Sequence, residues 1–369
     1  DDELKEYVID TPYTPLPWIN YLAGDDFFSI ISNTAGGYSF YRDAKLRRIT
    51  RYRYNSPATD NGGRYFYITD GETTFSPAFL PSKTPLDSYK CRHGLNYTVF
   101  ESSKNKILTE LTCFVPQKDA MEINLLKIRN ESDQAKKLSV YGGVEFCLWN
   151  AQDDTTNFQR NYNTGEVEIV TDKNYGAVYH KTEYRERRNH YAFFSLNAPI
   201  DGYDTDRDTF LGKFNGFDAP EAVRLGTSFN EKASGWSPAA FLRKDVTLKQ
   251  NEEISLIYIL GYVENDDGEK WEAPNVINKK KALSMIDKYR DEKTVRRELE
   301  RLKKDRGSLL DHFSVKTNDE KFDRVVNIWN QYQCLITYLM SRSASYYESG
   351  IGRGMGFRDS CQDLLGFVH

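Results

Sequence analysis

The chain contains the run ILTELTCFV at residues 107–115 and, shortly after it, the run EINLLKI at residues 122–128. In both, apolar residues alternate with polar ones or follow one another directly, a pattern that is typical of β-strands. Similar runs recur between turn-forming Asn-Gly and Asp-Gly pairs, namely LSVYGGV (138–144), YAFFSL (191–196) and ISLIYIL (254–260). Because no helical pattern intervenes, residues 1–265 are predicted to form one large antiparallel β-sandwich.

The composition changes near residue 264, where the strand-like runs end. A polar connector leads into a charged segment in which apolar residues recur every three or four positions, the spacing of one helix face. These residues are Ile277, Ala282, Met285, Ile286, Tyr289, Val295, Leu299 and Leu302. Residues 266–310 are therefore predicted to be a helical linker of one or two amphipathic helices, whose charged face is solvated.

A third segment, residues 311–369, opens with Thr-Asn-Asp-Glu at 317–320, the pattern of a helix capping box. The helix is predicted to end near Met340 and to carry a wide apolar stripe. Val325, Ile328, Trp329, Tyr332, Leu335, Ile336 and Leu339 form this stripe. A single helix and a glycine-rich loop cannot enclose a core, so we expect the stripe to need helical partners beyond residue 369.

Charge and cysteine content indicate which classes of protein and which cellular location to expect. The formal net charge of −4 provides no electrostatic basis for binding nucleic acid. The sequence shows no signal-peptide pattern and no run of 18 apolar residues, so neither secretion nor membrane insertion is expected. Five widely spaced cysteines without a CxxC pair favour reduced thiols and a cytoplasmic location. The five histidines are scattered, and no metal site is predicted.

Residues 341–369 read SRSASYYESGIGRGMGFRDSCQDLLGFVH and combine charge with glycine. Arginine forks and carboxylates suit the binding of sugar hydroxyls or phosphate. The glycines lack the GxGxxG spacing of a dinucleotide-binding loop. The charged residues are Arg342, Glu348, Arg353, Arg358, Asp359 and Asp363. Since the sequence stops in what reads as the start of a helix, we expect the chain to be a portion of a longer protein.

A second candidate binding segment runs from Trp149 to Asn161. It concentrates polar, planar and aromatic side chains between two strand-like runs. Loops of this kind often carry binding function. A purely structural role in a turn is the alternative.

Several segments resemble, in order, those of the cellobiose phosphorylases, a family of inverting glycoside phosphorylases. They are PWINYL (17–22), SIISNTAGGY (29–38), NFQRN (157–161), KTEYRERRNH (181–190) and Gly350–His369. The resemblance covers nearly the whole chain. It implies an N-terminal β-sandwich, a linker of two helices and an (α/α)6 catalytic barrel, of which residues 311–369 would be the beginning. Family members continue for more than as many residues again.

The resemblance implies reversible phosphorolysis of cellobiose to α-glucose 1-phosphate and glucose, with inversion. Phosphate is already a nucleophile, so one carboxylic acid that protonates the leaving oxygen suffices, whereas an inverting hydrolase needs two. The family's general acid lies in a later barrel segment. The resemblance therefore implies that the acid lies beyond His369, that residues 1–369 hold no catalytic residue, and that this chain alone is inactive. No cofactor is implied, because inorganic phosphate is a co-substrate.

The resemblance also implies roles for residues near the C-terminal end. Arg342 occupies a phosphate-binding position, where a guanidinium fork matches phosphate geometry. Arg353 and Asp359 occupy positions that hold the non-reducing glucose. Arg358 and Asp363 lie in the same motif and are expected to form a supporting ion pair.

Gln159 and Arg160 resemble the tip of a sandwich loop that reaches the partner subunit's active site in the family's homodimer. The expected partners are therefore cellobiose or a related β-glucoside, phosphate and glucose 1-phosphate. The expected partners also include a second copy of the chain and a C-terminal half. Nucleic acid and membranes are not expected partners.

Two alternatives remain open. A cellodextrin phosphorylase or another β-glucoside phosphorylase would share these segments and differ in its acceptor. A non-catalytic carbohydrate-binding β-sandwich is the alternative from another class. The helix at 317–340 and the glycine-rich motif argue against it, because a free-standing binding module needs neither.

Overall fold

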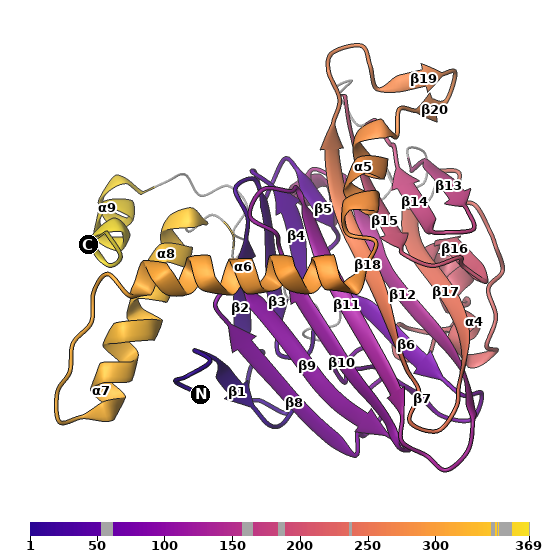
Figure 1. Cartoon of the computed structure of the whole chain (residues 1–369). Coiled ribbons are helices and arrows are strands. Elements are labelled where there is room, and N and C mark those ends of the chain that lie inside the picture. The colour runs from indigo at the N-terminus through magenta and orange to yellow at the C-terminus, as the bar shows by residue number, and fades with distance from the viewer. Residues whose placement is uncertain are drawn as a thin grey trace.

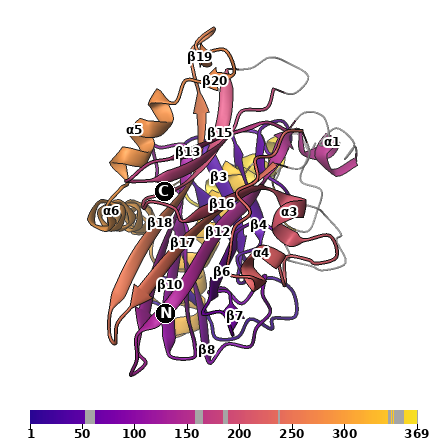
Figure 2. The ribbon, with the colours of Figure 1, turned by 90° about the vertical axis from the view of Figure 1, so that its right-hand side faces the viewer.

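The computed structural model describes residues 1–52, 62–156, 165–183, 189–235, 238–340, 344, 346 and 356–368. Two large antiparallel sheets form the body of the molecule, with helices across one sheet and at one end (Figure 1; Figure 2). The first sheet has the order β1 (Tyr7–Ile9), β8 (Ser88–Gly94), β9 (Tyr97–Lys104), β10 (Ile107–Phe114), β11 (Met121–Asn130), β18 (Glu253–Glu264), β15 (His190–Leu196), β14 (Gly176–His180), β13 (Val167–Thr171).

The second sheet is also antiparallel, and its longest strand branches to a hairpin. Its order is β16 (Gly202–Asp206), β17 (Pro238–Leu248), β12 (Lys136–Trp149), β5 (Arg48–Thr50), β4 (Gly37–Tyr41), β3 (Phe27–Ser32), β2 (Ile19–Ala23), while β6 (Tyr65–Thr69) pairs with β12 and β7 (Thr74–Phe75). The predicted antiparallel sandwich is confirmed, and the five quoted runs fall in β10, β11, β12, β15 and β18.

Strands β11 and β18 are buried on both faces, which explains the nearly continuous apolar run of β18. Leu126 and Leu256 are cross-strand partners and point into the core between the sheets. Their neighbours Leu125 and Ile257 form the next pair and point to the outer face, where a second core lies under two helices.

Those two helices are α5 (Lys280–Lys288) and α6 (Glu292–Leu310), which cross the outer face of the first sheet (Figure 1). The predicted amphipathic pattern is confirmed, since every apolar residue named for the linker is buried or packs against this outer core. Asp291 caps α6 by accepting the N–H of Thr294. None of the helices within the described ranges is long and apolar enough to cross a membrane.

The remaining described elements lie at the periphery. Helix α1 (Ala151–Thr156) follows β12, and helices α3 (Arg207–Leu211) and α4 (Glu221–Arg224) follow β16. Strands β19 (Trp271–Ala273) and β20 (Val276–Ile277) form a hairpin that projects beyond the sandwich (Figure 1). Helix α9 (Phe357–Leu365) lies at the C-terminal end.

The predicted helix near 317–340 exists and runs from Glu320 to Leu339. Its parts are α7 (Glu320–Arg324), a π-helical stretch η2 (Val325–Asn330) and α8 (Gln331–Leu339). The predicted capping box is wrong in one respect, because the N-cap is Asp319, whose carboxylate accepts the N–H groups of Lys321 and Phe322. Thr317 instead directs both its N–H and its hydroxyl to Asp323, which leaves Asp319 as the capping acceptor.

The expectation that this helix's apolar stripe lacks a partner within the chain is wrong. Ile328, Tyr332 and Ile336 are buried against the outer face of β2, β3 and β4, where they meet apolar side chains such as Phe28 and Tyr38. Strands β3 and β4 are buried on both faces, so the second sheet offers an apolar outer surface to the helix. The sandwich itself therefore covers much of the stripe, although Val325 stays exposed.

Candidate functional site

The structure places three of the seven predicted site residues. Arg358, Asp359 and Asp363 lie on α9, whereas Gln159, Arg160, Arg342 and Arg353 lie outside the described residues. The described part of the candidate site therefore consists of α9 and of the contacts made by residues that are close in sequence to the other four.

Helix α9 presents its predicted residues on different faces. Asp359 stands half-buried in the first turn, where the partial positive charge of the helix N-terminus stabilises a carboxylate. Arg358 is exposed and Asp363 is buried. Positions five apart on an α-helix are rotated by about 140° from one another. The two side chains therefore leave the helix in different directions, and the expected ion pair between Arg358 and Asp363 stays a prediction.

Helix α9 is held beside α8 by close packing. The rings of Tyr338 and Phe367 meet edge to face, with centroids 5.5 Å apart. Gly366 lies against Cys334 so closely that a Cβ atom there would be 2.7 Å from the Cβ atom of Cys334. A glycine is thus required for this approach of the two helices, and the approach sets the position of α9 and of Asp359.

The chain between α8 and α9 is anchored at Tyr346, which is four positions after Arg342 in the sequence. The hydroxyl of Tyr52 donates to the carbonyl oxygen of Tyr346 at 2.8 Å, and the two rings lie 5.2 Å apart. The ring of Tyr38 also packs against Tyr52, with centroids 5.2 Å apart, and the guanidinium of Arg48 stacks 3.7 Å from the Tyr38 ring.

The chain before Gln159 is anchored by a buried ion pair on α1. Arg51 donates from Nε and Nη2 to the two carboxylate oxygens of Asp154, at 2.7 and 2.8 Å. Both side chains are almost fully buried. Burial alone would lower the pKa of Arg51, but the Asp154 carboxylate raises it above its ordinary value, so the guanidinium stays charged.

The same arginine belongs to a larger polar network. Its Nη1 atom lies 3.6 Å from the carboxylate of Glu145, on β12. Glu145 also accepts from the hydroxyl of Tyr65 at 3.1 Å and lies 3.5 Å from Arg207. Each buried charge therefore has at least one opposite charge beside it, which offsets the cost of removing it from water.

Two segments singled out in the sequence meet at Trp149. The indole ring stacks on His190 with centroids 4.2 Å apart and on His180 at 5.1 Å, and its Nε1–H donates to the carbonyl oxygen of Thr182 at 2.9 Å. Burial lowers the pKa of His180 to about 3, so its ring is neutral at physiological pH. The Trp149–Asn161 segment and the residues around 181–190 are thus joined at their described ends.

Arg51 and Tyr52 are the residues whose importance the sequence did not reveal. They are consecutive, yet one holds the chain before Gln159 and the other holds the chain after Arg342. The only sequence signal is the alternating Arg-Tyr-Arg-Tyr at 51–54, which is unusual for a polar turn.

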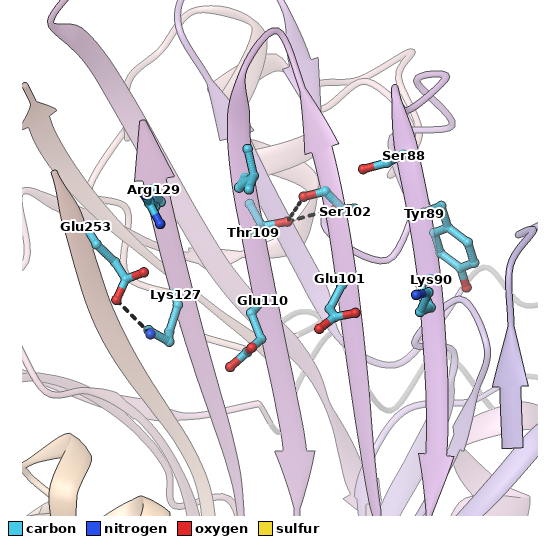
Figure 3. Close-up of a pocket in the computed structure, with 11 residues that line it drawn as sticks. Ser88, Tyr89, Lys90, Glu101, Ser102, Thr109, Glu110, Lys127, Arg129 and Glu253 are labelled. Carbon is cyan, nitrogen blue, oxygen red and sulfur yellow. Dashed lines mark hydrogen bonds and ion pairs between the residues drawn. The ribbon is translucent and has the colours of Figure 1, made fainter. Parts of the chain in front are cut away.

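A hollow in the described surface lies elsewhere, on the outer face of the first sheet (Figure 3). Its volume is about 370 Å³, and charged side chains of β8 to β11 and β18 line it. Within this lining Lys127 lies 2.7 Å from Glu253, and Glu101 lies 2.7 Å from Arg92, which is outside the lining. Paired charges on an open sheet face are typical of a solvated surface, and we assign no ligand to this hollow.

These features define a multidomain protein, in which a large β-sandwich is joined by two helices to the first helices of a second domain. The chain belongs to the glycosyl hydrolase 94 family. Residues 5–292 match the supersandwich domain of glycosyl hydrolase 94, and residues 306–369 match the catalytic domain of the glycosyl hydrolase 94 superfamily. The helices from α7 onward therefore begin the (α/α)6 catalytic domain of this family.

Curated relatives extend the comparison. An N,N'-diacetylchitobiose phosphorylase of Vibrio proteolyticus is 33% identical over 100% of this chain and 44% of its own length. The enzyme of the same name from Vibrio furnissii is 32% identical over 100% of this chain and 44% of its own length. A solabiose phosphorylase of Paenibacillus borealis is 26% identical over 97% of this chain and 44% of its own length. The chain thus spans less than half the length of these relatives.

Proposed function

We propose that the whole protein is a glycoside phosphorylase, which cleaves a β-linked disaccharide with inorganic phosphate and releases a sugar 1-phosphate. The observation that carries this proposal is the match of one chain to both the supersandwich and the catalytic domain of the family, together with relatives that are named phosphorylases. A non-catalytic sugar-binding sandwich would have no need of the second domain.

The proposed chemistry is a single displacement. Phosphate attacks the anomeric carbon while an acid protonates the leaving oxygen, so the product has the inverted, α configuration. We propose that Arg342 binds phosphate and that Arg353 and Asp359 hold the non-reducing sugar. A guanidinium fork can stabilise the negative charge that moves onto the transferring group. We assign the general acid to no residue between 1 and 369.

Two disaccharides are candidate substrates. The sequence segments of the chain resemble those of cellobiose phosphorylases, whereas the two Vibrio relatives are named for N,N'-diacetylchitobiose. Both disaccharides present the same β-linkage and differ at the acetamido groups, so either would suit arginine and carboxylate groups that bind hydroxyls. We keep cellobiose as the first proposal and N,N'-diacetylchitobiose as the second.

Gln159 and Arg160 are proposed to act across a homodimer, at the active site of the partner subunit. Mixing an Arg160→Ala protein with a variant that lacks the general acid should then restore some activity through hybrid dimers. No recovery despite proven subunit exchange would mean that the loop serves its own subunit's site or only the interface.

One assay tests the proposed reaction. The whole protein is incubated with cellobiose, N,N'-diacetylchitobiose or solabiose, with and without phosphate, and products are followed by NMR. We expect an α-sugar 1-phosphate from one of them, only when phosphate is present. Equal sugar release without phosphate would identify a hydrolase, and a β-phosphate product would exclude single displacement.

A further inference from the structure

The dipeptide Arg51–Tyr52, which follows β5, contacts two distant parts of the chain. The Arg51 side chain reaches Asp154, 103 positions later, and the Tyr52 side chain reaches Tyr346, 294 positions later. The backbone is itself held, because the N–H of Arg51 donates to the carbonyl oxygen of Glu145 at 3.0 Å. This one dipeptide thus contacts residues that are close in sequence to both sets of proposed ligand-binding residues.

Arg51 holds α1 through its contact with Asp154. A helix of six residues is too short to be stable alone, so α1 depends on its contacts with the rest of the protein. The two-point contact between the guanidinium and Asp154 fixes both position and orientation, which a single-point cation could not do. Gln159 and Arg160 follow α1 within four positions.

Tyr52 holds the backbone of Tyr346 by a hydrogen bond. Its hydroxyl donates to that carbonyl oxygen, and its ring contacts the rings of Tyr38 and Tyr346. Tyr346 is itself 2% exposed, so this point of the chain cannot move without opening the packed cluster. Arg342 lies four positions before Tyr346.

We propose that Arg51 and Tyr52 are positioning residues for the reaction. Arg51 acts through Asp154 on the segment that carries Gln159 and Arg160, and Tyr52 acts through Tyr346 on the segment that carries Arg342. The kinetic consequences rest on the proposed function, whereas the anchoring can be measured without any activity. Because the two residues are adjacent, a substitution at one is expected to affect mainly its own segment and partly the other.

Amide hydrogen exchange of the 369-residue chain tests the anchoring. Arg51→Lys keeps the charge but loses the fork, and should speed exchange in the α1 peptide by about tenfold. Tyr52→Phe keeps the ring but loses the hydroxyl, and should do the same in the peptide around Tyr346.

Two matched variants control for general destabilisation. Arg42→Lys breaks an exposed two-point contact with Asp26, and Tyr67→Phe removes a hydroxyl that donates to the carbonyl oxygen of Phe217 at 2.7 Å. Neither should change exchange in the α1 peptide or the Tyr346 peptide. If Arg51→Lys and Tyr52→Phe leave both peptides unchanged, or alter them no more than the controls do, the anchoring is refuted.

Steady-state kinetics of the whole protein test the positioning role. Tyr52→Phe should raise KM for phosphate by about 3- to 10-fold, and Arg51→Lys should raise KM for the disaccharide by a similar factor. KM does not depend on how much of the enzyme is folded, so partial unfolding would lower kcat alone. Unchanged KM values in an active enzyme would overturn the positioning role. A wild-type enzyme with no phosphate-dependent activity would instead refute the proposed function, and the exchange result would still decide the anchoring.

Discussion

The hydroxyl of Tyr332, on α8, accepts the backbone N–H of Asn96 at 2.9 Å. Asn96 lies in the turn between β8 and β9 in the left-handed region, with φ 73°, and its side chain bonds to both the N–H and the carbonyl oxygen of Ala23 on β2. The hydroxyl of Tyr332 also lies 3.0 Å from the carbonyl oxygen of Tyr21. This contact therefore ties the first helices of the catalytic domain to both sheets of the sandwich.

Replacing Tyr332 should loosen the helix without removing its apolar packing. Tyr332→Phe leaves the buried N–H of Asn96 without its acceptor, which costs about 1–3 kcal/mol of unfolding free energy. Chemical denaturation measures this loss, and amide exchange should show it first in α8. Tyr13→Phe, at a tyrosine that is 69% exposed, is the control and should change stability by less than about 0.5 kcal/mol. A Tyr332→Phe protein as stable as this control would show that the contact contributes nothing.

The β-sandwich could be predicted because its signal is local. Strands such as β10 and β11 show their period within a few residues, and Asp70-Gly71 marks the hairpin between β6 and β7. The partner of α8 could not be predicted in this way. The apolar stripe shows that the helix is covered, but only the three-dimensional pairing of β2, β3 and β4 shows that the sandwich covers it.

The residues of the candidate site show the same difference between local and long-range signals. Motif resemblance can nominate Asp359 or Arg342, because each stands within a recognisable segment. The anchors Arg51 and Tyr52 act on residues 103 and 294 positions away, and no local pattern connects them. Long-range side-chain contacts of this kind depend on strand order, which sequence periodicity does not contain.

Two buried histidines should make the protein sensitive to mild acid. Burial lowers the pKa of His93 to about 4 and of His180 to about 3, against about 6.5 in an unfolded chain. Between about pH 6.5 and 4 the unfolded chain binds more protons, so stability is full above pH 6.5 and falls as the pH drops. These two histidines should take up to two protons on unfolding, so denaturation midpoints at pH 7, 6 and 5 should contain this uptake, less the proton that Asp204 releases over the same range. A His93→Gln variant should flatten this slope, and an unchanged slope would contradict the prediction.

Asp204 should have the opposite pH dependence. Its side chain is fully buried on β16, and burial raises its pKa to about 7, although the N–H groups of Phe229 and Asn230 partly offset the shift by donating to Oδ1. The folded state then holds more protons than the unfolded state between about pH 4 and 7, so this residue's contribution falls as the pH rises through that window.

Asp204→Asn isolates this effect, because an amide oxygen can accept the same two N–H groups. Relative to wild type, the variant should gain stability between pH 5 and pH 8, and the difference should level off above about pH 7. The comparison cancels the histidine contribution, which is common to both proteins. A stability difference that does not change with pH would show that Asp204 is ionised across the range.

The contact between α8 and α9 should not tolerate a side chain at Gly366. In Gly366→Ala the new methyl group would overlap the sulfur of Cys334 and lie 2.7 Å from its Cβ atom, so the helices must separate. We expect a loss of about 1–3 kcal/mol, partly recovered by Cys334→Ala. Gly307→Ala on α6 is the matched control, because its methyl group would meet only Lys5 at 3.7 Å, and it should stabilise the protein by up to about 1 kcal/mol. Equal effects of the two alanines would show that α9 does not pack as described.

Asp359 should matter for turnover rather than for folding. Its half-buried carboxylate stands in the first turn of α9, and we propose that it holds the non-reducing sugar. In the whole protein, Asp359→Ala should lower kcat/KM for the disaccharide by about 30- to 1000-fold, since a charge-assisted contact in the transition state contributes roughly 2–4 kcal/mol.

Arg358→Ala, at the exposed neighbouring position, is the control and should have a much smaller effect on kcat/KM. Because α9 keeps its packing on α8 in both variants, their thermal stabilities should match within a few degrees. Near-normal kinetics of Asp359→Ala would remove this residue from the proposed sugar site, and an equal loss in both variants would point to a disturbed helix instead.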